Sequence, residues 1–348
     1  MKIAFFIGSL RRGGAERVIS ILANHYARRG WQVDILLLLE NQCGYELESG
    51  VRLVDCTVKG TSYGARMPRW LGRIRAYVKR DKPDRVVSFI GRINGLVLAA
   101  CLGLRVPIIV SERNDPKRDG RGALIRWGCN LLYPKARAVV FQNEHERACF
   151  SRGIRRKGRV IPNPVSVTCA PGSADGWRIV TAGRLVPQKN QRLLLEAFAR
   201  LRRELPQCTL TLYGDGPLGE ALTHQARELG IESAVELAGN VTDLHQRIAG
   251  ARLFVMASDF EGLSNALLEA MMLGLACVST KYDGVEEVIK QEESGLLAPV
   301  GDANALAAAM LRVLRDPALE AKLRAGALKT AEQYRAERVL DLWDEVIG

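Results

Sequence analysis

Segments with a strand pattern and segments with a helix pattern alternate along the whole chain, and this alternation constrains the fold more than any other feature. Short apolar runs are followed by loops and longer amphipathic stretches in both halves of the sequence. That order is typical of parallel sheets covered by helices on both faces. Because 348 residues exceed what one hydrophobic core usually holds, we expect an α/β protein with two sheets of the nucleotide-binding type.

A glycine-rich loop follows the first expected strand. Residues 2–10 are almost continuously apolar, Gly13 and Gly14 come next, and a helical pattern then runs to Gly30. Strand, glycine loop and helix is the order that a phosphate-facing turn needs. The loop lacks the Gly-x-Gly-x-x-Gly spacing of dinucleotide-binding enzymes, so a dehydrogenase receives little support. His25 lies on the apolar face of this helix, which indicates packing rather than catalysis.

Two glutamates eight residues apart, Glu261 and Glu269, flank an expected helix start. If the helix begins near Ser264, Glu261 lies in the preceding loop and Glu269 about a turn and a half inside the helix. A helix N-terminus attracts anions, here through the backbone N–H groups of Gly262, Leu263, Ser264 and Asn265. The alternative is that both carboxylates are solvated charges beside an apolar helix stripe.

A second loop carries two cations between a strand pattern and a helix pattern. Residues 177–181 are strand-like, Gly183, Arg184 and Lys189 follow, and residues 193–201 form an apolar helical segment. Two preorganised cations suit a diphosphate leaving group, whose negative charge grows as its bond breaks. An isolated arginine and lysine would be weak evidence, and the later Gly-Asp-Gly-Pro turn at Gly214 is common by itself.

Taken together, these segments resemble the Glu-x7-Glu motif and the Gly-Arg-Leu…Lys loop of family 4 glycosyltransferases, which are retaining, use nucleotide sugars and build bacterial polysaccharides and lipid-linked glycans. The resemblance spans essentially the whole chain and is densest from Gly183 to Asp302. It implies the GT-B fold, in which two Rossmann-like domains face each other across a cleft. It also implies transfer of a hexose or N-acetylhexosamine from a UDP-sugar to a glycan, most often one carried on a lipid.

The resemblance also implies roles for single residues. Glu261, Arg184 and Lys189 would be catalytic, with Glu261 at the donor sugar and the two cations at the diphosphate. Glu269 would accept hydrogen bonds from the ribose. The other donor-binding positions would be Gly13, Gly14, Gly183, Gly214, Val241, Gly262, Leu263, Ser264 and Asn265. Retention would arise by front-face attack rather than through a covalent carboxylate intermediate.

Cofactors and metals are not expected. The chain has no Asp-x-Asp metal motif, its eight cysteines form no Cys-x-x-Cys pair, and its four histidines do not cluster. Under the resemblance, Arg184, Lys189 and helix dipoles take the place of a metal. The nucleotide sugar is therefore a substrate and no cofactor is predicted.

The boundary between the two domains is expected at the Pro-Asn-Pro sequence of residues 162–164, which resembles the interdomain marker of the family. We expect an N-terminal acceptor-side domain at 1–165 and a nucleotide-sugar-binding domain at 166–330. A C-terminal helix at 331–348 is expected to pack back on the first domain, as in GT-B proteins. It would carry Tyr334, Val339, Leu342, Trp343 and Val346.

Positive charge is concentrated in the first half of the chain. Residues 1–170 hold 31 Lys and Arg against 13 Asp and Glu, a net +18, while the remainder holds 19 against 25, a net −6. An anionic membrane surface or a lipid-diphosphate acceptor fits this patch, and nucleic acid fits least because no binding module accompanies the charge. Trp70, Tyr77 and Trp127 lie among the basic residues and suit an interface, although a solvated basic face is an equal alternative.

The expected location is the cytoplasm, at the inner face of the cell membrane. No apolar stretch reaches the roughly 18 residues that span a bilayer. The first apolar run is short, and no small-residue cleavage site follows it, so it does not fit a signal peptide.

Acceptor-binding residues are expected after two strand-like runs in the first half, at 85–89 and 107–110. Sites in α/β proteins lie at such strand ends, which points to Arg92, Asn94, Arg113 and Asn114. Many family members carry a histidine at the position of Arg113, and this departure puts that role in doubt. Arg113 would either bind an acceptor phosphate or pair with Glu112 or Asp115.

Two other functions share most of these features. A GT-B enzyme that does not transfer sugar, such as a UDP-sugar epimerase, would have the same fold, because fold alone does not decide function. A non-catalytic basic membrane-binding protein is the other alternative. The simultaneous presence of Arg184, Lys189, Glu261 and Glu269 argues against it.

Overall fold

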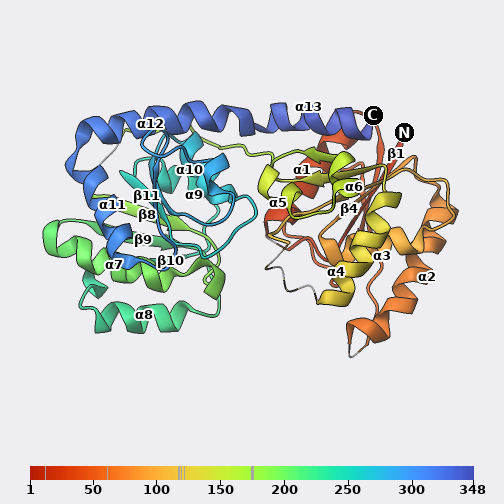
Figure 1. Ribbon diagram of the computed structural model, residues 1–348, viewed down its shortest axis with the longest axis horizontal. Coiled ribbons are helices and arrows are strands. Elements are labelled where there is room, and N and C mark those ends of the chain that lie inside the picture. The colour runs from red at the N-terminus through yellow and green to blue at the C-terminus, as the bar shows by residue number, and fades with distance from the viewer. Residues whose placement is uncertain (12, 61, 117, 119, 121, 174–175) are drawn as a thin grey trace. The chain divides into compact units, whose positions relative to one another are not determined.

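Two compact α/β units make up the chain. The computed structural model describes residues 1–11, 13–60, 62–116, 118, 120, 122–173 and 176–348. Unit 1 contains Met1–Pro164 and Ala336–Gly348, and unit 2 contains Val165–Arg335 (Figure 1). Each unit has one parallel sheet with helices on both faces, so the predicted α/β class with two Rossmann-like sheets is confirmed.

Unit 1 is built on a seven-stranded parallel sheet of order β3-β2-β1-β4-β5-β6-β7. The strands are β1 Lys2–Ile7, β2 Gln32–Leu37, β3 Val51–Asp55, β4 Arg85–Phe89, β5 Ile108–Ser111, β6 Ala138–Phe141 and β7 Gly158–Val160. The inner strands are apolar on both faces because helices cover both. The direction of the strand order changes between β1 and β4, which is where binding sites form in such sheets.

The helices of unit 1 divide between the two faces of its sheet. They are α1 Gly14–Arg28, α2 Tyr63–Asp81, α3 Gly91–Ala100, α4 Ala123–Leu132, α5 Glu144–Ala148, α6 Arg152–Arg156 and α13 Ala336–Ile347. Alternate residues of β1 point to opposite sides. Phe5 packs in the cluster that contains residues of α1 and α13, and Phe6 packs in the cluster that contains residues of α2, α3 and α4.

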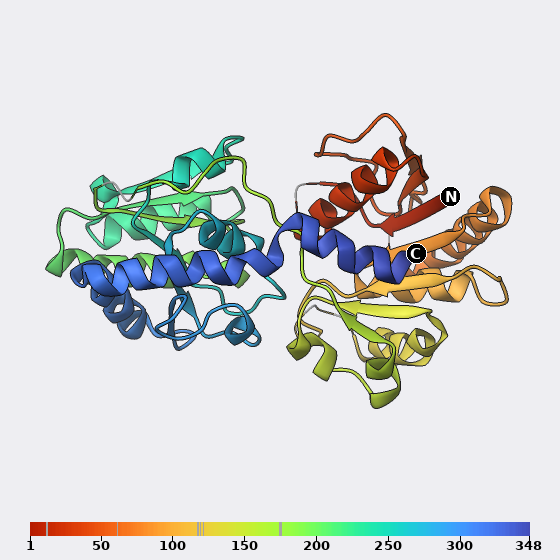
Figure 2. The ribbon, with the colours of Figure 1, turned by 90° about the horizontal axis from the view of Figure 1, so that it is seen from above.

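The C-terminal helix α13 is fixed to α1 and to the sheet of unit 1 (Figure 2). The Trp343 ring stacks on Phe89 with 5.8 Å between centroids. Asp344 accepts hydrogen bonds from the Tyr26 hydroxyl at 2.9 Å and from Arg29. The fully buried indole and the ion pair together hold α13 against unit 1.

The structure divides the expected C-terminal helix at residue 335. Helix α12 Pro317–Ala331 is followed by a 3-10 turn at Glu332–Tyr334, and α13 starts at Ala336. The helix ends because Arg335 is extended, with φ −56° and ψ 140°, and the Val165 N–H donates to the Tyr334 carbonyl at 3.0 Å. Tyr334 therefore belongs to the core of unit 2 rather than to the last helix.

Unit 2 contains a six-stranded parallel sheet of order β10-β9-β8-β11-β12-β13. The strands are β8 Arg178–Ala182, β9 Thr209–Tyr213, β10 Val235–Gly239, β11 Leu253–Met256, β12 Ala276–Thr280 and β13 Leu296–Ala298. Here the order changes direction between β8 and β11, so the loops that follow these two strands lie side by side at the carboxyl edge.

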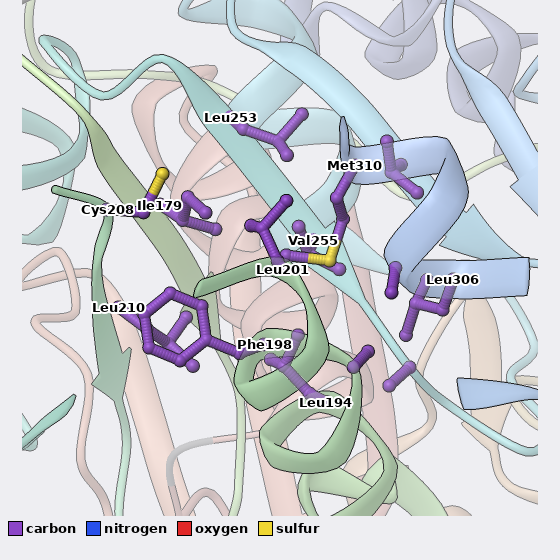
Figure 3. Close-up of a cluster of buried hydrophobic side chains, with 14 of the residues drawn as sticks. Ile179, Leu194, Phe198, Leu201, Cys208, Leu210, Leu253, Val255, Leu306 and Met310 are labelled. Carbon is purple, nitrogen blue, oxygen red and sulfur yellow. The ribbon is translucent and has the colours of Figure 1, made fainter. Parts of the chain in front are cut away.

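The remaining helices of unit 2 are α7 Gln191–Glu204, α8 Gly219–Glu228, α9 Leu244–Ile248, α10 Asn265–Met272 and α11 Ala303–Arg315. One apolar cluster joins α7 and α11 to the sheet. Figure 3 shows Leu194, Phe198 and Leu201 of α7 among side chains of the strands and of α11. A second cluster contains buried residues of α10, including Leu267 and Met271. Packing from both sides fixes the strand ends that carry the loops described next.

Candidate active site

The predicted motif residues of unit 2 meet where the strand order changes direction. The loop after β8 contains Gly183, Arg184 and Lys189, and the loop after β11 contains Glu261. Since β8 and β11 pair directly, their loops contact each other. Two motifs more than 70 residues apart in sequence are thereby brought together at one position.

Glu261 is held by side chains from both loops. Its Oε1 accepts from Lys189 Nζ at 2.6 Å and from the Ser258 hydroxyl at 2.7 Å, and its Oε2 accepts from Gln188 Nε2 at 3.3 Å. Glu261 is 9% exposed and the Lys189 side chain 17% exposed. Charge-assisted hydrogen bonds of this kind fix the orientation of a carboxylate. Glu261 is thus not a solvated charge, and that alternative is wrong for this residue.

A further set of polar contacts ties the two loops together. Asn190 Nδ2 donates to Asp259 Oδ1 at 2.8 Å, and the Asp259 N–H donates to the Gln188 carbonyl at 2.9 Å. Gln188 Nε2 also donates to the Phe260 carbonyl at 2.9 Å. The sequence analysis did not identify these residues. Their only signal was a run of amide and carboxylate side chains beside the two motifs, which is common in any loop.

Helix α10 starts where the sequence predicted. Ser264 is the N-cap, and its hydroxyl accepts from the Leu267 N–H at 3.5 Å. Residues 262–265 therefore form the turn into the helix, with Leu263 and Ser264 buried. The backbone N–H groups at such a start attract an anion.

Glu269 is buried on α10 beside His245 of α9. Its carboxylate is 3% exposed, and His245 Nε2 lies 3.4 Å from its Oε2. The Thr168 N–H donates to His245 Nδ1 at 3.2 Å, which leaves the ring proton on Nε2, facing the carboxylate. Glu269, like Glu261, is not a solvated charge. The pairing with His245 was missed because the two residues are distant in sequence.

Glycines allow the loops after β8, β9 and β10 to lie close together. The Gly183 N–H donates to the Tyr213 carbonyl at 2.9 Å, and the Gly214 N–H donates to the Gly239 carbonyl at 2.8 Å. Gly214 has φ 125°, and a Cβ there would collide with the Gly183 carbonyl. A side chain at this position would therefore strain the backbone as well as clash. Val241, in the loop after β10, packs against the same core as α10.

Arg184 differs from Lys189 in its surroundings. Its side chain is exposed, and its guanidinium has no hydrogen-bond or ion-pair partner among the described residues. The Arg184 carbonyl accepts from Gln191 Nε2 at 2.9 Å, which anchors the backbone of the loop. One cation of the pair is thus engaged with Glu261 while the other faces solvent.

The glycine loop of unit 1 also lies where the strand order of its sheet changes direction. Gly13 is the N-cap of α1, and Gly14 is the first residue of that helix. The Gly13 N–H donates to the Tyr45 hydroxyl at 2.9 Å, and this hydroxyl donates to the Gly13 carbonyl at 2.8 Å. Tyr45 was not predicted to have a role, yet it fixes the backbone of this loop.

The predicted acceptor residues of unit 1 contact other residues of the same unit. Asn94 is completely buried, and its amide donates to the Ser111 carbonyl at 2.9 Å and to the Tyr133 hydroxyl at 3.2 Å. Arg92 donates to the Gly120 carbonyl, and Asn114 Oδ1 accepts from the next N–H at 3.0 Å. Asn94 thus serves the interior of unit 1, and we do not retain it as an acceptor contact.

Arg113 packs inside unit 1. Its guanidinium carbon lies 5.2 Å from the Phe89 ring centroid and 5.4 Å from that of Trp343. Its Nε donates to the Ser111 hydroxyl at 2.7 Å and its Nη1 to Asn163 Oδ1 at 2.8 Å. Burial lowers the pKa of Arg113 to about 10. The expected pairing with Glu112 or Asp115 is wrong, because the contacts of this cation are aromatic rings and neutral oxygens, and the carboxylate that acts on it electrostatically is that of Glu146.

Two of the three predicted interfacial aromatics are also internal. Trp70 is fully buried and its Nε1 donates to the Leu38 carbonyl at 2.9 Å, while the Tyr77 hydroxyl donates to Asp34 Oδ2 at 2.5 Å. Both lie on the inner face of α2, so their role at an interface was a wrong prediction. Trp127 on α4 is 64% exposed. Lys117 and Arg121 of the predicted basic clusters lie outside the described residues.

Within the described residues, none of the helices has the length and hydropathy to cross a bilayer. No three potential metal-ligating side chains gather in that part of the chain either.

Family models match both units. Residues 13–164 match the glycosyl transferase 4-like domain, and residues 176–316 match the domain described as glycosyl transferases group 1. The two matches cover the glycine loop of unit 1 and both motif loops of unit 2.

Similar proteins align over nearly the whole chain. A Campylobacter jejuni α-1,4-N-acetyl-D-galactosaminyltransferase, named for a diNAcBac-PP-undecaprenol-linked substrate, is 26% identical over 100% of this chain and 98% of its own. The Rhizobium meliloti lipopolysaccharide core glycosyltransferase LpsE is 27% identical over 97% and 96%. The crystal structure of Anabaena HepE with UDP superimposes with a TM-score of 0.85 at 20% identity, covering 99% of both chains. By its two domains, its full-length relatives and its fold, the chain belongs to the family 4-like glycosyltransferases of the GT-B fold.

Proposed function

We propose that this glycosyltransferase moves a hexose or N-acetylhexosamine from a UDP-sugar to a lipid-linked glycan with retention of anomeric configuration. The observation that carries the proposal is the arrangement around Glu261, whose carboxylate is oriented by Lys189 and Ser258 at the carboxyl edge of unit 2. A buried, oriented acid in contact with Lys189, with the exposed Arg184 on the same loop as that lysine, suits a donor that carries both a sugar and a diphosphate.

The donor diphosphate would bind between the two cations and the start of α10. Arg184 has its guanidinium exposed, and Lys189 lies close enough to Glu261 to share its charge between the carboxylate and a phosphate. The N–H groups of residues 262–265 add the positive end of the helix. Several solved relatives support the choice of UDP, since HepE is described in complex with UDP and with UDP-glucose.

Glu269 would accept hydrogen bonds from the ribose hydroxyls, since it is a buried carboxylate on the same helix. Glu261 would contact the transferred sugar. By the family resemblance, Gly13 and Gly14 of unit 1 would also take part in donor binding, and Gly183, Gly214 and Val241 would shape the pocket of unit 2. These assignments extend the family resemblance to the positions described above.

The reaction would proceed on one face of the sugar. The bond between the anomeric carbon and the phosphate oxygen breaks, the acceptor hydroxyl oxygen bonds to the same face of that carbon, and its proton passes to the departing phosphate. Arg184 and Lys189 would stabilise the charge that develops on the diphosphate. Glu261 would stabilise the positive charge on the sugar without forming a covalent bond to it, which differs from the two-carboxylate scheme of glycosidases.

No metal ion or other cofactor is needed in this scheme, because the two cations occupy the role that a divalent ion has in other transferases. The acceptor would lie on unit 1, with Arg92 and Asn114 as the remaining candidates for polar contacts. Relatives named for undecaprenol-linked and lipopolysaccharide substrates support a lipid-linked acceptor. The enzyme would then work at the inner surface of the cell membrane, attached by charge, with no nucleic-acid partner.

The experiment has two stages. Thermal shift with UDP- and GDP-sugars identifies the donor, because a ligand that binds only the folded state raises Tm. Transfer to polyprenyl-diphosphate-linked glycans is then measured, and NMR of the product gives the anomeric configuration. We expect UDP release that depends on added acceptor and an anomeric centre like that of the donor. UDP release or sugar interconversion without acceptor would favour an epimerase or hydrolase, and an inverted product would overturn the retaining scheme.

A further inference from the structure

Helix α4 carries the three most exposed large apolar side chains of the described residues. Leu124 is 79% exposed, Trp127 64% and Leu131 60%. Their spacing of three and four residues puts them on one face of the helix. Scattered exposed apolar residues are ordinary, but three such side chains in a row on one helix form a continuous patch.

The opposite face of α4 is the one that unit 1 uses. Ile125, Cys129 and Leu132 belong to or pack against the core cluster that α3 shares. A Cβ added to Gly95 of α3 would lie 3.3 Å from Cys129 Sγ, so the two helices are in close contact. The inner face therefore accounts for the folding of α4, and the outer apolar face contributes nothing to the core.

Charge around α4 identifies what the outer face binds. No Asp or Glu occurs from Gly122 to Asn143, whereas the exposed Arg126 and Lys135 do. Helix α2, which lies on the same side of the sheet beyond α3, adds further exposed arginines (Figure 1). An apolar face with a tryptophan and a basic surround matches the headgroup region of an anionic bilayer. A protein partner would have to supply matching acidic groups around an apolar centre.

We propose that α4 is a membrane-docking helix, in which Leu124, Trp127 and Leu131 insert among the headgroups of an anionic phospholipid bilayer. Arg126 and its basic neighbours then contact the lipid phosphates. The purpose of this surface rests on the proposed lipid-linked acceptor, but the docking itself does not. It also replaces Trp70 and Tyr77, which are internal, as the apolar part of the membrane contact.

Vesicle binding by the full chain tests the proposal. The full chain is required because α13 belongs to unit 1 and would be lost from an N-terminal fragment. We expect sedimentation with vesicles of phosphatidylcholine and phosphatidylglycerol, weaker binding to phosphatidylcholine alone, and at least about tenfold weaker binding for Leu124→Ser/Trp127→Ser/Leu131→Ser. The matched control is Leu229→Ser/Val300→Ser, which removes exposed apolar side chains of unit 2 and should bind like the unchanged chain.

Tryptophan fluorescence gives a second measurement that does not depend on removing the apolar face. Brominated phospholipids should quench Trp127 most, since it is 64% exposed, whereas Trp70 and Trp343 are fully buried and Trp31 and Trp177 are partly buried. Trp127→Phe should keep vesicle binding and lose most of that quenching. Unchanged quenching in this variant would mean that α4 does not enter the bilayer, and the proposal would be overturned.

Two further outcomes would also overturn it. The triple serine variant could bind anionic vesicles as tightly as the unchanged chain. Alternatively, analytical ultracentrifugation could find a dimer that the triple variant disperses, which would make α4 a contact between copies. Transfer to a soluble acceptor analogue should be unchanged in the triple variant and slower to a lipid-linked acceptor in vesicles. If the unchanged chain transfers sugar to neither acceptor, the proposed function fails while the vesicle results still decide the docking.

Discussion

The two units have the same type of fold, but the side chains at the carboxyl edges of their sheets have different surroundings. In unit 2, Lys189, Ser258 and Glu261 reach across from neighbouring loops and bind one another. In unit 1, Arg113, which follows β5 at the carboxyl edge of the sheet, instead turns inward to Phe89 and Trp343. The carboxyl edge of the sheet therefore carries a cluster of interacting charged side chains in unit 2, whereas in unit 1 the charged side chain is packed against aromatic rings.

This difference indicates where side-chain chemistry is concentrated. The cations and carboxylates suited to a charged donor lie in unit 2, while the glycine loop of unit 1 is shaped through its backbone by Tyr45. We therefore expect substitutions in the unit 2 cluster to affect turnover, and substitutions at the predicted unit 1 positions to affect stability.

The largest expected effect is on turnover in unit 2. Glu261→Ala and Lys189→Ala should each reduce kcat by about a hundredfold or more, because under the proposed function each removes a charge that would stabilise the breaking bond. Steady-state transfer rates measure this, with circular dichroism to verify folding. Arg203→Ala, which removes an exposed cation of the same unit, is the control. Rates near those of the unchanged enzyme for both variants would refute the assigned site.

A smaller effect is expected at the buried pair on α9 and α10. Glu269→Ala should raise the donor KM by about tenfold while changing kcat less, because under the proposed function it would bind the ribose rather than the reacting atoms. His245→Ala should shift KM in the same direction through loss of the group beside Glu269. Equal loss of kcat and kcat/KM would instead mean that Glu269 acts in the transition state.

Glycine substitutions extend the comparison to the backbone. Gly214→Ala should destabilise unit 2 by about 2 kcal/mol or more, because its Cβ meets the Gly183 carbonyl and its φ is 125°. Gly13→Ala should cost less, since its Cβ meets only the flexible Glu16 side chain. Urea unfolding of the two variants measures the difference. Similar losses would show that both loops are equally rigid.

Arg113 provides the reverse test in unit 1. Arg113→Met should lower Tm by a few degrees, because it removes three hydrogen bonds, the cation between two rings and the charge that acts on Glu146. The KM for acceptor should stay within about twofold. A large rise in that KM with unchanged Tm would restore Arg113 to the acceptor site and weaken the contrast between the units.

The smallest expected effect is that of chelation. Transfer rates should be unchanged in EDTA, because under the proposed function Arg184 and Lys189 would supply the positive charge at the diphosphate. Activity that is lost in EDTA and restored by magnesium or manganese would contradict this expectation.

The sequence predicted the features that are encoded locally. The strand at 85–89 and the helix start at Ser264 were predicted because an apolar run and a capping residue are patterns that lie within a few consecutive positions. Contacts between residues that are distant in sequence were not predicted. Arg113 meets Asn163 and Trp343, and Glu269 meets His245, and neither pairing leaves a mark in the nearby sequence.

Amphipathic helices were a second source of error. Trp70 and Tyr77 lie among arginines in sequence, which suggested an interface, but on α2 they face the sheet while the arginines face away. Hydrogen bonds from their polar ends to Leu38 and Asp34 make this burial favourable. Helix α4 poses a different problem, because it has apolar residues on two faces. Composition alone does not show which of these faces packs against the core of unit 1.

The chain passes from unit 1 to unit 2 and back at two positions that lie close together, and this affects how recombination could exchange a unit. Unit 2 begins at Val165 and ends at Arg335, and these two residues pair as a short parallel bridge. The first and last residues of unit 2 thus lie next to each other, so the whole unit could be replaced by that of a related enzyme with only two adjacent junctions. The last thirteen residues follow unit 2 in the sequence, but they must come from the same parent as residues 1–164, because α13 completes unit 1. A recombinant that takes residues 336–348 from the donor of unit 2 would combine unit 1 with a final helix from another protein.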